Sequence, residues 1–323
     1  MVNIIVNPAS KSGYGLKMWK ELESYLIEHH VEYKAFLSEK PGDITKFAHK
    51  LCTEGSSASD APIRIIVAGG DGTFNEALQG ITDFDRVELG YVPTGSSNDL
   101  ARDLGIKKEA TEVLSDILSC KEPFLMDLGC LTYHDTSDEL SRLHTEDGSD
   151  TRYFSVSCGI GYDAAICEEA LASPFKNILN KIGMGKLTYL MISIKQLIQT
   201  KRGNCTITLD NQAPIELKQF LFVATMIHRY EGGGFMFCPD ANAQDGIFNL
   251  CAVGPISKPK ILIALPSALK GQHFRYPNIY PYEGATVHIE ADRPFWIHTD
   301  GEVSRKSKSI TIKCLQKRIR LLK

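Results

Sequence analysis

Residues 65–76 read IIVAGGDGTFNE. The apolar start is typical of a buried strand, and a helix is expected from Thr73. Three glycines within four positions let the backbone approach a ligand without Cβ clashes, and the helix N-terminus offers N–H groups to a phosphate. An ordinary strand–turn–helix is the alternative, but Asp71 has no packing purpose there. A carboxylate beside a phosphate is expected if Mg²⁺ bridges the two or if the carboxylate handles a proton.

Two further loops resemble the first in composition. Residues 7–13 (NPASKSG) and 93–99 (PTGSSND) each follow an apolar run. Ligands of open α/β sheets bind outside the carboxyl ends of the strands, so the three loops together predict one phosphate site. The chain has neither GxxxxGK[ST] nor GxGxxG, and residues 159–161 (GIG) are interpreted as a turn.

The first third alternates strand and helix patterns, which favours βαβ units and a parallel sheet covered on both faces. Strands are expected at 2–6, 33–37, 63–68 and 87–92, and helices at 16–26, 43–51, from 73, at 98–104 and at 111–118. The pattern becomes β-rich after about residue 124. Strands are expected at 153–158, 204–209, 215–225, 247–253, 286–289 and 310–315, with helices at 164–172, 175–182, 187–200 and 258–269. We therefore predict an α/β domain over 1–126, which carries the expected phosphate site, and a β-sandwich domain over 127–299.

Composition excludes several classes of protein. The 323 residues carry a formal charge of −3, with 43% hydrophobic and 23% charged residues, so the chain is neither disordered nor an overall nucleic-acid binder. No apolar run approaches the roughly 18 residues of a spanning helix, and no basic segment precedes the first apolar run. The nine cysteines are dispersed and form no CxxC pair, which predicts reduced thiols and a cytoplasmic protein.

Two carboxylate motifs lie in the second half. Residues 239–248 (PDANAQDGIF) follow the three glycines 232–234, and Asp245 there could bind a hard cation together with backbone carbonyls. Residues 298–302 (HTDGE) hold two carboxylates across a glycine, which suits proton transfer from a substrate hydroxyl. A hairpin turn is the alternative interpretation of each motif.

Four motifs, taken in their order and spacing, resemble those of the bacterial diacylglycerol kinase-like lipid kinases, which are related to sphingosine and ceramide kinases. They are GGDGTFNE at 69–76, PTGSSNDLAR at 93–102, GGG…PDANAQDGIF at 232–248 and DGE at 300–302. GGDGT alone is shared with NAD kinases and phosphofructokinases, whereas a DGE near the C-terminus is not typical of those. The resemblance implies a Rossmann-like, NAD kinase- and phosphofructokinase-like domain, completed by about 300–323, joined to a β-sandwich.

The resemblance also implies roles for individual residues. The residues expected to hold ATP are Asn7, Pro8, Ala9, Ser10, Lys11, Ser38, Gly69, Gly70, Asp71, Gly72, Thr73, Phe74, Asn75 and Thr94. Asp71 would act through the catalytic Mg²⁺ and Asp99 on the acceptor side, while Glu302 matches the proton acceptor and Asp300 its companion. Asp245 matches a structural Mg²⁺ ligand, with the carbonyls of Asn242 and Ile247. The family usually has Thr at position 38, and Asp where this chain has Gln244.

The expected activity is transfer of the γ-phosphoryl group of ATP to a lipid hydroxyl, with diacylglycerol giving phosphatidic acid. A soluble-substrate kinase of the NAD kinase type and a non-catalytic nucleotide-binding regulator are the alternatives. The expected partner is a lipid substrate at the membrane surface, and no nucleic-acid partner is expected. A homodimer is an open alternative to a monomer. Eight Lys or Arg and no carboxylate occupy residues 304–323, so this segment is predicted to meet anionic membranes. The alternative is that these residues lie on strands and face solvent or ATP phosphate. The acidic stretch 134–150 is expected to be a surface loop.

Overall fold

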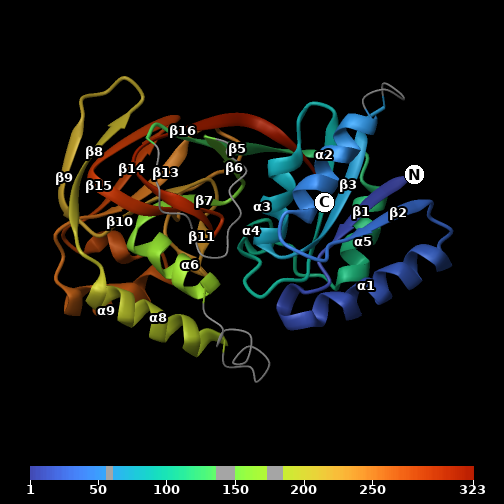
Figure 1. The fold of residues 1–323 in the computed structure, drawn as a ribbon, viewed down its shortest axis with the longest axis horizontal. Helices are drawn as coiled ribbons and strands as arrows, with labels where there is room; N and C mark the ends of the chain where they lie inside the picture. Colours follow the sequence, from blue (N-terminus) through green and yellow to red (C-terminus); the bar gives the residue numbers. More distant parts are fainter. Residues whose placement is uncertain (56–60, 136–149, 173–184) are drawn as a thin grey trace. The chain divides into compact units, whose positions relative to one another are not determined.

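The computed structural model describes residues 1–55, 61–135, 150–172 and 185–323 (Figure 1). The predicted helix at 175–182 and most of the acidic stretch 134–150 lie outside the described residues. The chain forms two compact units, one of residues 1–128 with 316–323 and the other of residues 129–315. Each unit is described by itself.

The first unit contains a parallel sheet in the order β2-β1-β3-β4-β16, where the last strand is the C-terminal end of β16 (Glu302–Leu322). Its first four strands are β1 (Val2–Val6), β2 (Tyr33–Leu37), β3 (Ile63–Gly69) and β4 (Val87–Pro93). The helices between them are α1 (Ser10–Glu28), α2 (Asp43–Gly55), α3 (Asp71–Gly80), α4 (Asp99–Asp103) and α5 (Ala110–Ser119). The predicted α/β architecture is therefore confirmed.

Both faces of this sheet are covered. Apolar side chains of α1 and α5, among them Trp19, Leu22 and Leu114, share one core with Ile4 and Ile66 of the strands. Helices α2 and α3 pack against each other and against β3 (Figure 1). A sheet enclosed in this way requires apolar side chains on both faces of its strands, which explains the continuous apolar runs in the sequence.

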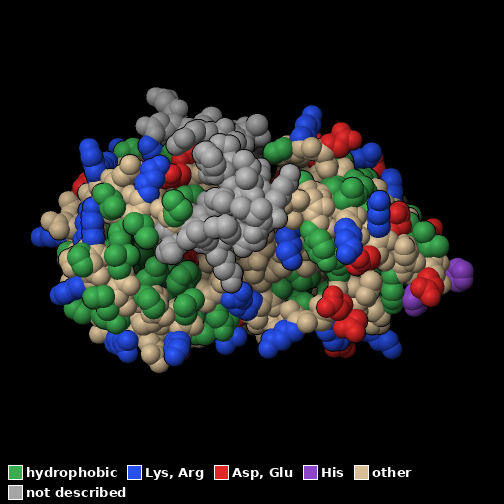
Figure 2. Space-filling model, turned by 90° about the horizontal axis from the view of Figure 1, so that it is seen from below, with side chains coloured by type: hydrophobic (Ala, Val, Ile, Leu, Met, Phe, Trp, Pro, Cys, Tyr) green, Lys and Arg blue, Asp and Glu red, His purple; other side chains and the backbone are tan. Residues whose placement is uncertain are grey.

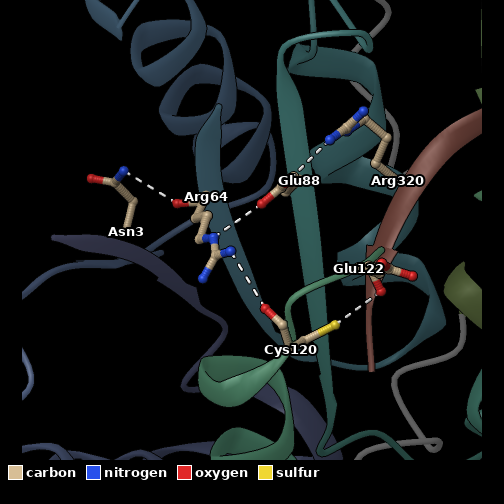
Figure 3. Close-up of polar contacts among 6 residues, drawn as sticks. All are labelled: Asn3, Arg64, Glu88, Cys120, Glu122 and Arg320. Atoms are coloured by element: carbon tan, nitrogen blue, oxygen red, sulfur yellow. Dashed lines mark hydrogen bonds and ion pairs between the residues drawn. The ribbon is translucent and has the colours of Figure 1, made fainter. Parts of the chain in front are cut away.

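A buried carboxylate joins three strands of the first sheet (Figure 3). Glu88 of β4 is 4% exposed and accepts hydrogen bonds from Arg64 of β3 at 3.0 Å and from Arg320 of β16 at 2.9 Å. The Arg64 carbonyl accepts a further bond of 3.3 Å from Asn3 of β1. Two guanidinium groups thus offset the cost of burying one carboxylate, and the bond from Arg320 holds the C-terminal strand against β4.

The second unit is mainly antiparallel, with strand order β14-β13-β10-β7-β15-β16 and with β8–β9 and β5–β6 pairs beside it. Its strands are β5 (Phe124–Tyr133), β6 (Thr151–Phe154), β7 (Ser157–Gly161), β8 (Gly203–Leu209), β9 (Ile215–Phe220), β10 (Phe222–Met226), β11 (Tyr230–Glu231), β12 (Phe235–Met236), β13 (Phe248–Val253), β14 (Ile279–Gly284), β15 (Thr286–Thr299) and β16 (Glu302–Leu322). Its helices are α6 (Tyr162–Ala172), α8 (Gly185–Gln199), α9 (Lys258–Ala268) and the short 3₁₀ turn η1 (His273–Arg275).

The second unit differs from the sequence prediction in several details. β5, β11 and β12 were not expected, and β15 and β16 are longer than the strands expected at 286–289 and 310–315. The single strands expected at 153–158 and 215–225 are each two strands, separated at 155–156 and at Leu221. Gln219 has a left-handed backbone with φ of 47°, and it lies at the register shift between the Cys205–Leu217 and Gly203–Phe220 pairs, just before Leu221. β14 was not expected; it lies at the sheet edge, where its Pro281 needs no N–H partner.

The C-terminal basic segment is part of β16 rather than a separate tail. Residues 302–313 pair with β15 in the second unit, so the segment that joins the first unit begins at Gln316 rather than near residue 300. Arg318 contacts Asp85 at 2.6 Å, and the Lys323 ammonium lies 3.8 Å from the centre of the Phe124 ring. Several of the cations that were expected to face a membrane therefore contact the protein itself. Among the helices that the structure describes, none is long and apolar enough to cross a membrane.

Candidate active site

The loops that follow β1, β3 and β4 meet at one edge of the first sheet. The main-chain N–H of Asn7 donates to the Ala68 carbonyl at 3.0 Å, and that of Thr94 donates to the Gly69 carbonyl at 2.7 Å. Each loop thus leaves its strand still bonded to the neighbouring strand. The parallel order of the strands places all three loops at the carboxyl edge, as the sequence predicts.

Side chains connect these loops in pairs. The Asn7 amide donates to Thr73 Oγ1 at 3.0 Å, which links the first loop to the start of α3. The hydroxyls of Ser10 and Thr94 lie 3.0 Å apart, which links the first loop to the loop after β4. Four residues expected to hold ATP therefore form two hydrogen-bonded pairs. The members of the second pair are 84 positions apart in sequence.

The glycines of this region serve close approach of the loops. A Cβ at Gly95 would lie 2.5 Å from the Cα of Gly70, and a Cβ at Gly69 would lie 2.3 Å from the Thr73 side chain. Gly70 itself has φ of −94° and ψ of −175°, an extended backbone that any residue adopts. The glycine at position 70 is therefore needed for space rather than for its conformation.

Asp71 stands at the first position of α3, and its carboxylate faces the loop after β4. It accepts main-chain bonds from Asp99 at 2.9 Å and from Leu100 at 3.3 Å, and a bond from the Tyr91 hydroxyl at 3.3 Å. These bonds fix the orientation of the carboxylate and hold the start of α4. Asp99 is 5% exposed and lies directly at that start. The two acidic residues of the predicted site are thus neighbours in space.

The remaining residues expected at the nucleotide differ in position. Lys11 has φ of 48° and begins a left-handed turn, and its ammonium lies 5.0 Å from the Tyr14 ring centre. The Ser38 N–H donates to the Val6 carbonyl at 3.0 Å, so Ser38 adjoins the end of β1. Phe74 and Asn75 are fully buried, which leaves their side chains to the interior of the unit.

In the second unit, residues 299–302 form the tight turn between β15 and β16. Asp300 and Gly301 have φ of 51° and 85°, and Thr299 pairs with Glu302 across the turn. The Asp300 carboxylate accepts main-chain bonds from residues 155, 156 and 157 at 2.9, 2.8 and 3.0 Å, and one from the Ser155 hydroxyl at 3.2 Å. Asp300 therefore anchors the turn to the segment between β6 and β7, while Glu302 stays partly exposed.

A buried histidine supports the same turn and was not identified from the sequence. His298 is 0% exposed, and its Nε2 lies 3.1 Å from Glu231 Oε1 and 3.4 Å from Asp163 Oδ2. Burial lowers the pKa of His298, but the charge of Glu231 and the nearby carboxylate of Asp163 raise it more, so that the pKa lies well above its ordinary value. Burial raises the pKa of Asp163.

Glu231 directly precedes the three glycines 232–234, all with positive φ, which form the hairpin between β11 and β12. The contact between Glu231 and His298 therefore links two of the motifs, the triple glycine and the DGE. The sequence does show a titratable residue beside each motif, Glu231 before the glycines and His298 before the DGE. It does not show that these two residues, 67 positions apart, are in contact.

The proposed metal ligand Asp245 lies in an exposed turn. Its Oδ1 accepts a bond of 3.0 Å from the Ile247 N–H, and the Asn242 side chain accepts one of 3.2 Å from the Gln244 N–H. Within residues 1–55, 61–135, 150–172 and 185–323, no group of three His, Cys, Asp or Glu side chains could hold a metal ion. A cation at Asp245 would thus depend on backbone carbonyls and water, which suit hard divalent cations.

With this geometry established, comparison with known proteins identifies the family. Residues 1–129 match the model of the diacylglycerol kinase catalytic domain, and residues 156–323 match that of the YegS C-terminal NAD kinase beta sandwich-like domain. The second match alone covers more than half of the chain. The chain belongs to the diacylglycerol kinase-like lipid kinase family. The expected family and fold class are both confirmed.

Individual members of the family agree over most of the length. A Bacillus subtilis protein named "Putative lipid kinase YtlR" is 28% identical over 301 residues, covering 93% of this chain and 92% of that protein. A Mycobacterium tuberculosis protein named diacylglycerol kinase is 24% identical over 289 residues, covering 90% of this chain and 84% of that protein. The crystal structure of a "putative diacylglycerol kinase" from Bacillus anthracis has a TM-score of 0.70 at 23% identity, covers 99% of this chain and 96% of that one, and supports the fold.

Proposed function

We propose that the chain is an ATP- and Mg²⁺-dependent lipid kinase that phosphorylates a primary hydroxyl of diacylglycerol and yields phosphatidic acid. The observation that carries the proposal is the convergence of three glycine- and hydroxyl-rich loops at one sheet edge, linked through Asn7–Thr73 and Ser10–Thr94. Membership of the diacylglycerol kinase-like family supports a lipid acceptor. Such an acceptor requires peripheral contact with a membrane.

The proposed reaction is a single phosphoryl transfer. The lipid hydroxyl oxygen bonds to the γ-phosphorus while the bond from that phosphorus to the bridging oxygen breaks, and ADP leaves with the electron pair. Glu302 accepts the hydroxyl proton, since a carboxylate at the edge of a tight turn can reach a substrate oxygen. Asp99 serves the acceptor side. Asp300 acts as a positioning residue, because its carboxylate is bonded to main-chain N–H groups of residues 155–157.

The donor set of the first unit fits a nucleotide with its Mg²⁺. The first N–H groups of α3 have no partner within the helix, and the N-terminus of a helix favours phosphate. Asp71 provides the hard oxygen ligands that Mg²⁺ prefers, and its orientation is fixed by the bonds from Asp99 and Leu100. When bound, Mg²⁺ neutralises phosphate charge.

The direct test is incubation of the purified protein with labelled ATP, Mg²⁺ and a panel of lipids in mixed micelles. We expect a chloroform-extractable product with diacylglycerol, and none from the Glu302→Gln variant. Phosphorylation of NAD to a water-soluble product without lipid turnover would support the NAD kinase alternative. Binding of ATP without turnover of any acceptor would support a regulatory role. Either of these results would contradict the proposal.

A further inference from the structure

Two helices of the second unit expose apolar side chains on one face. We call this set the α8–α9 face. Its members are Met191, Ile194, Ile198, Leu262, Ile263 and Leu269. Their exposed fractions range from 41% to 66%. Figure 2 shows apolar side chains gathered on the side of the second unit that carries these helices. Large apolar side chains exposed together mark a contact surface, whereas single ones need no explanation.

The two helices are held as one surface. The buried side chains Leu197 of α8 and Ile261 and Ala264 of α9 belong to the same core. The Lys258 ammonium at the start of α9 donates a bond of 2.7 Å to the Ile198 carbonyl near the end of α8. The guanidinium of Arg202 donates to the Ile256 carbonyl. The face is therefore formed by packed helices with an anchored inner side.

The spacing shows that each helix has an inner and an outer side. Met191, Ile194 and Ile198 recur at intervals of three and four, which places them on one side of α8, while Ile192 and Leu197 are buried. A helix that faces water normally carries polar residues on its outer side. Here three large apolar side chains are exposed on that side beside Lys195 and Gln199, so the outer side of α8 is suited to a partner that covers its apolar part.

The charges around the face indicate the kind of partner. Residues 185–202 and 257–275 contain eight Lys or Arg and no Asp or Glu, in a chain of net charge −3. Lys195 is paired with Glu169 of α6. Lys201, Lys260, Lys270 and Arg275 are exposed. Apolar side chains bordered by cations are typical of helices that lie in the interface of an anionic bilayer.

We infer that the α8–α9 face docks onto the surface of a bilayer rich in anionic lipid, with its apolar side chains entering the headgroup boundary. This inference rests on the proposed function, because a kinase acting on a lipid must meet a bilayer. It assigns the contact to this face rather than to the basic residues of β16, of which Arg318 and Arg320 are paired with carboxylates.

The test measures binding to vesicles directly. Co-sedimentation with vesicles of phosphatidylcholine and phosphatidylglycerol is compared for the wild type and the Ile198→Gln/Ile263→Gln double variant. We expect partitioning to fall roughly 10- to 100-fold, because two apolar contacts with the membrane are lost. The matched control is Ile27→Gln on α1 of the first unit, where Ile27 is 62% exposed against 64% for Ile263; it should bind as the wild type does.

Charge and assembly are tested separately. The Lys260→Gln/Lys270→Gln variant should lose affinity for anionic vesicles at low salt and should match the wild type on vesicles of phosphatidylcholine alone. Wild-type vesicle binding by the Ile198→Gln/Ile263→Gln variant would overturn the inference, as would failure of the wild type to bind anionic vesicles. A wild-type dimer in light scattering that the double variant converts to a monomer would show that a second copy covers the face, and would also overturn it.

Activity separates this inference from the proposed function. The Ile198→Gln/Ile263→Gln variant should phosphorylate short-chain diacylglycerol in detergent micelles at the wild-type rate, and should be at least about tenfold slower on diacylglycerol in vesicles. Equal rates on vesicles would overturn the docking surface while the kinase assignment stands. Absence of turnover by the wild type in both systems would contradict the proposed function, and vesicle binding would still decide the docking surface.

Discussion

The main-chain N–H of Gly301 donates a hydrogen bond of 3.2 Å to Nδ1 of His298. Gly301 separates Asp300 from Glu302, so the imidazole supports from inside the turn that carries both carboxylates. In the neutral ring the nitrogen that accepts this bond carries no proton, so the single proton is on Nε2, toward Glu231 and Asp163. The His298 ring therefore connects the carboxylates of Glu231 and Asp163 to the turn that carries Glu302, the proposed base.

The first prediction concerns this imidazole. His298→Ala should lower the free energy of unfolding by about 3–5 kcal/mol, because it leaves Glu231 and Asp163 without their shared buried partner. His298→Asn keeps an acceptor near the position of Nδ1, so it should retain more turnover per folded molecule than His298→Ala. Urea unfolding and kcat are the measurements. Equal stability of His298→Ala and the wild type would show that the imidazole does not hold the turn.

The raised pKa of His298 predicts a pH dependence of stability. The groups that face the ring are Glu231 of β11, Asp163 and Cys167 of α6, and Cys158 of β7. The folded state binds the proton more tightly than the unfolded state, so the stabilisation is fully present below the unfolded pKa of about 6.5. This stabilisation is lost as pH rises through the higher folded pKa. The Gly301 N–H donates to Nδ1, the nitrogen that the second ring proton occupies, so protonation of the ring breaks that bond and the stabilisation is reduced by its loss.

The difference in unfolding free energy between the wild type and His298→Asn should therefore be largest near pH 6 and should shrink toward pH 9. Chemical denaturation at a series of pH values measures this difference. The raised pKa of Asp163 also makes the free energy of unfolding fall as pH rises, and this effect begins at a lower pH. The same measurement in proteins that also carry Asp163→Asn removes the contribution of Asp163 and leaves that of His298. A difference that grows with pH would contradict the assignment.

The third prediction concerns the proposed base. Glu302→Gln should lower kcat by roughly 10²- to 10⁴-fold, the usual share of general-base catalysis, with unchanged ATP affinity and melting temperature. Asp300→Asn is the comparison, because it places an amide N–H against the N–H groups of residues 155–157 and should also lower stability. Near-wild-type turnover by a folded Glu302→Gln enzyme would exclude Glu302 as the base.

The sequence predicted the first unit well because its signals are local. A continuous apolar run such as 63–68, ended by glycine and followed by a helical pattern, admits few interpretations, and β3 and α3 are found there. The convergence of Asn7, Thr73 and Thr94 followed from the parallel order alone. In the second unit, strands such as β14 depend on their place in the sheet, and the splits at 155–156 and Leu221 depend on the bonds of neighbouring segments.

The supporting contacts of the DGE turn could not be predicted, because they join residues distant in sequence. Asp300 reaches residues 155–157, and His298 reaches Asp163 and Glu231, through the pairing of β15 with β7. A local motif shows which side chains are suited to the chemistry. Only the register of the strands shows which other residues hold them.

The fourth prediction concerns the glycine-rich loop. Gly70→Val should abolish binding of ATP with Mg²⁺, because a Cβ there would lie 3.1 Å from the Gly95 Cα, and a branched side chain would also fill the space beside the first turn of α3. The extended backbone of Gly70 accepts other residues, so the loss should come from space rather than strain. Calorimetric titration measures binding, with the melting temperature as the control. Unchanged affinity would place ATP elsewhere.

The last prediction concerns Asp245. If this carboxylate helps to bind a structural Mg²⁺, the cation should raise the melting temperature without nucleotide, because a ligand that binds only the native state stabilises it by mass action. Asp245→Asn keeps an acceptor for the Ile247 N–H, so the turn should persist in EDTA while the Mg²⁺ effect disappears. Asp240→Asn, an exposed position in the same segment, is the matched control and should respond as the wild type does. An equal Mg²⁺ response of Asp245→Asn and the wild type would show that these residues form only a hairpin turn, since a divalent ion bound through one carboxylate and backbone carbonyls depends on that single charge.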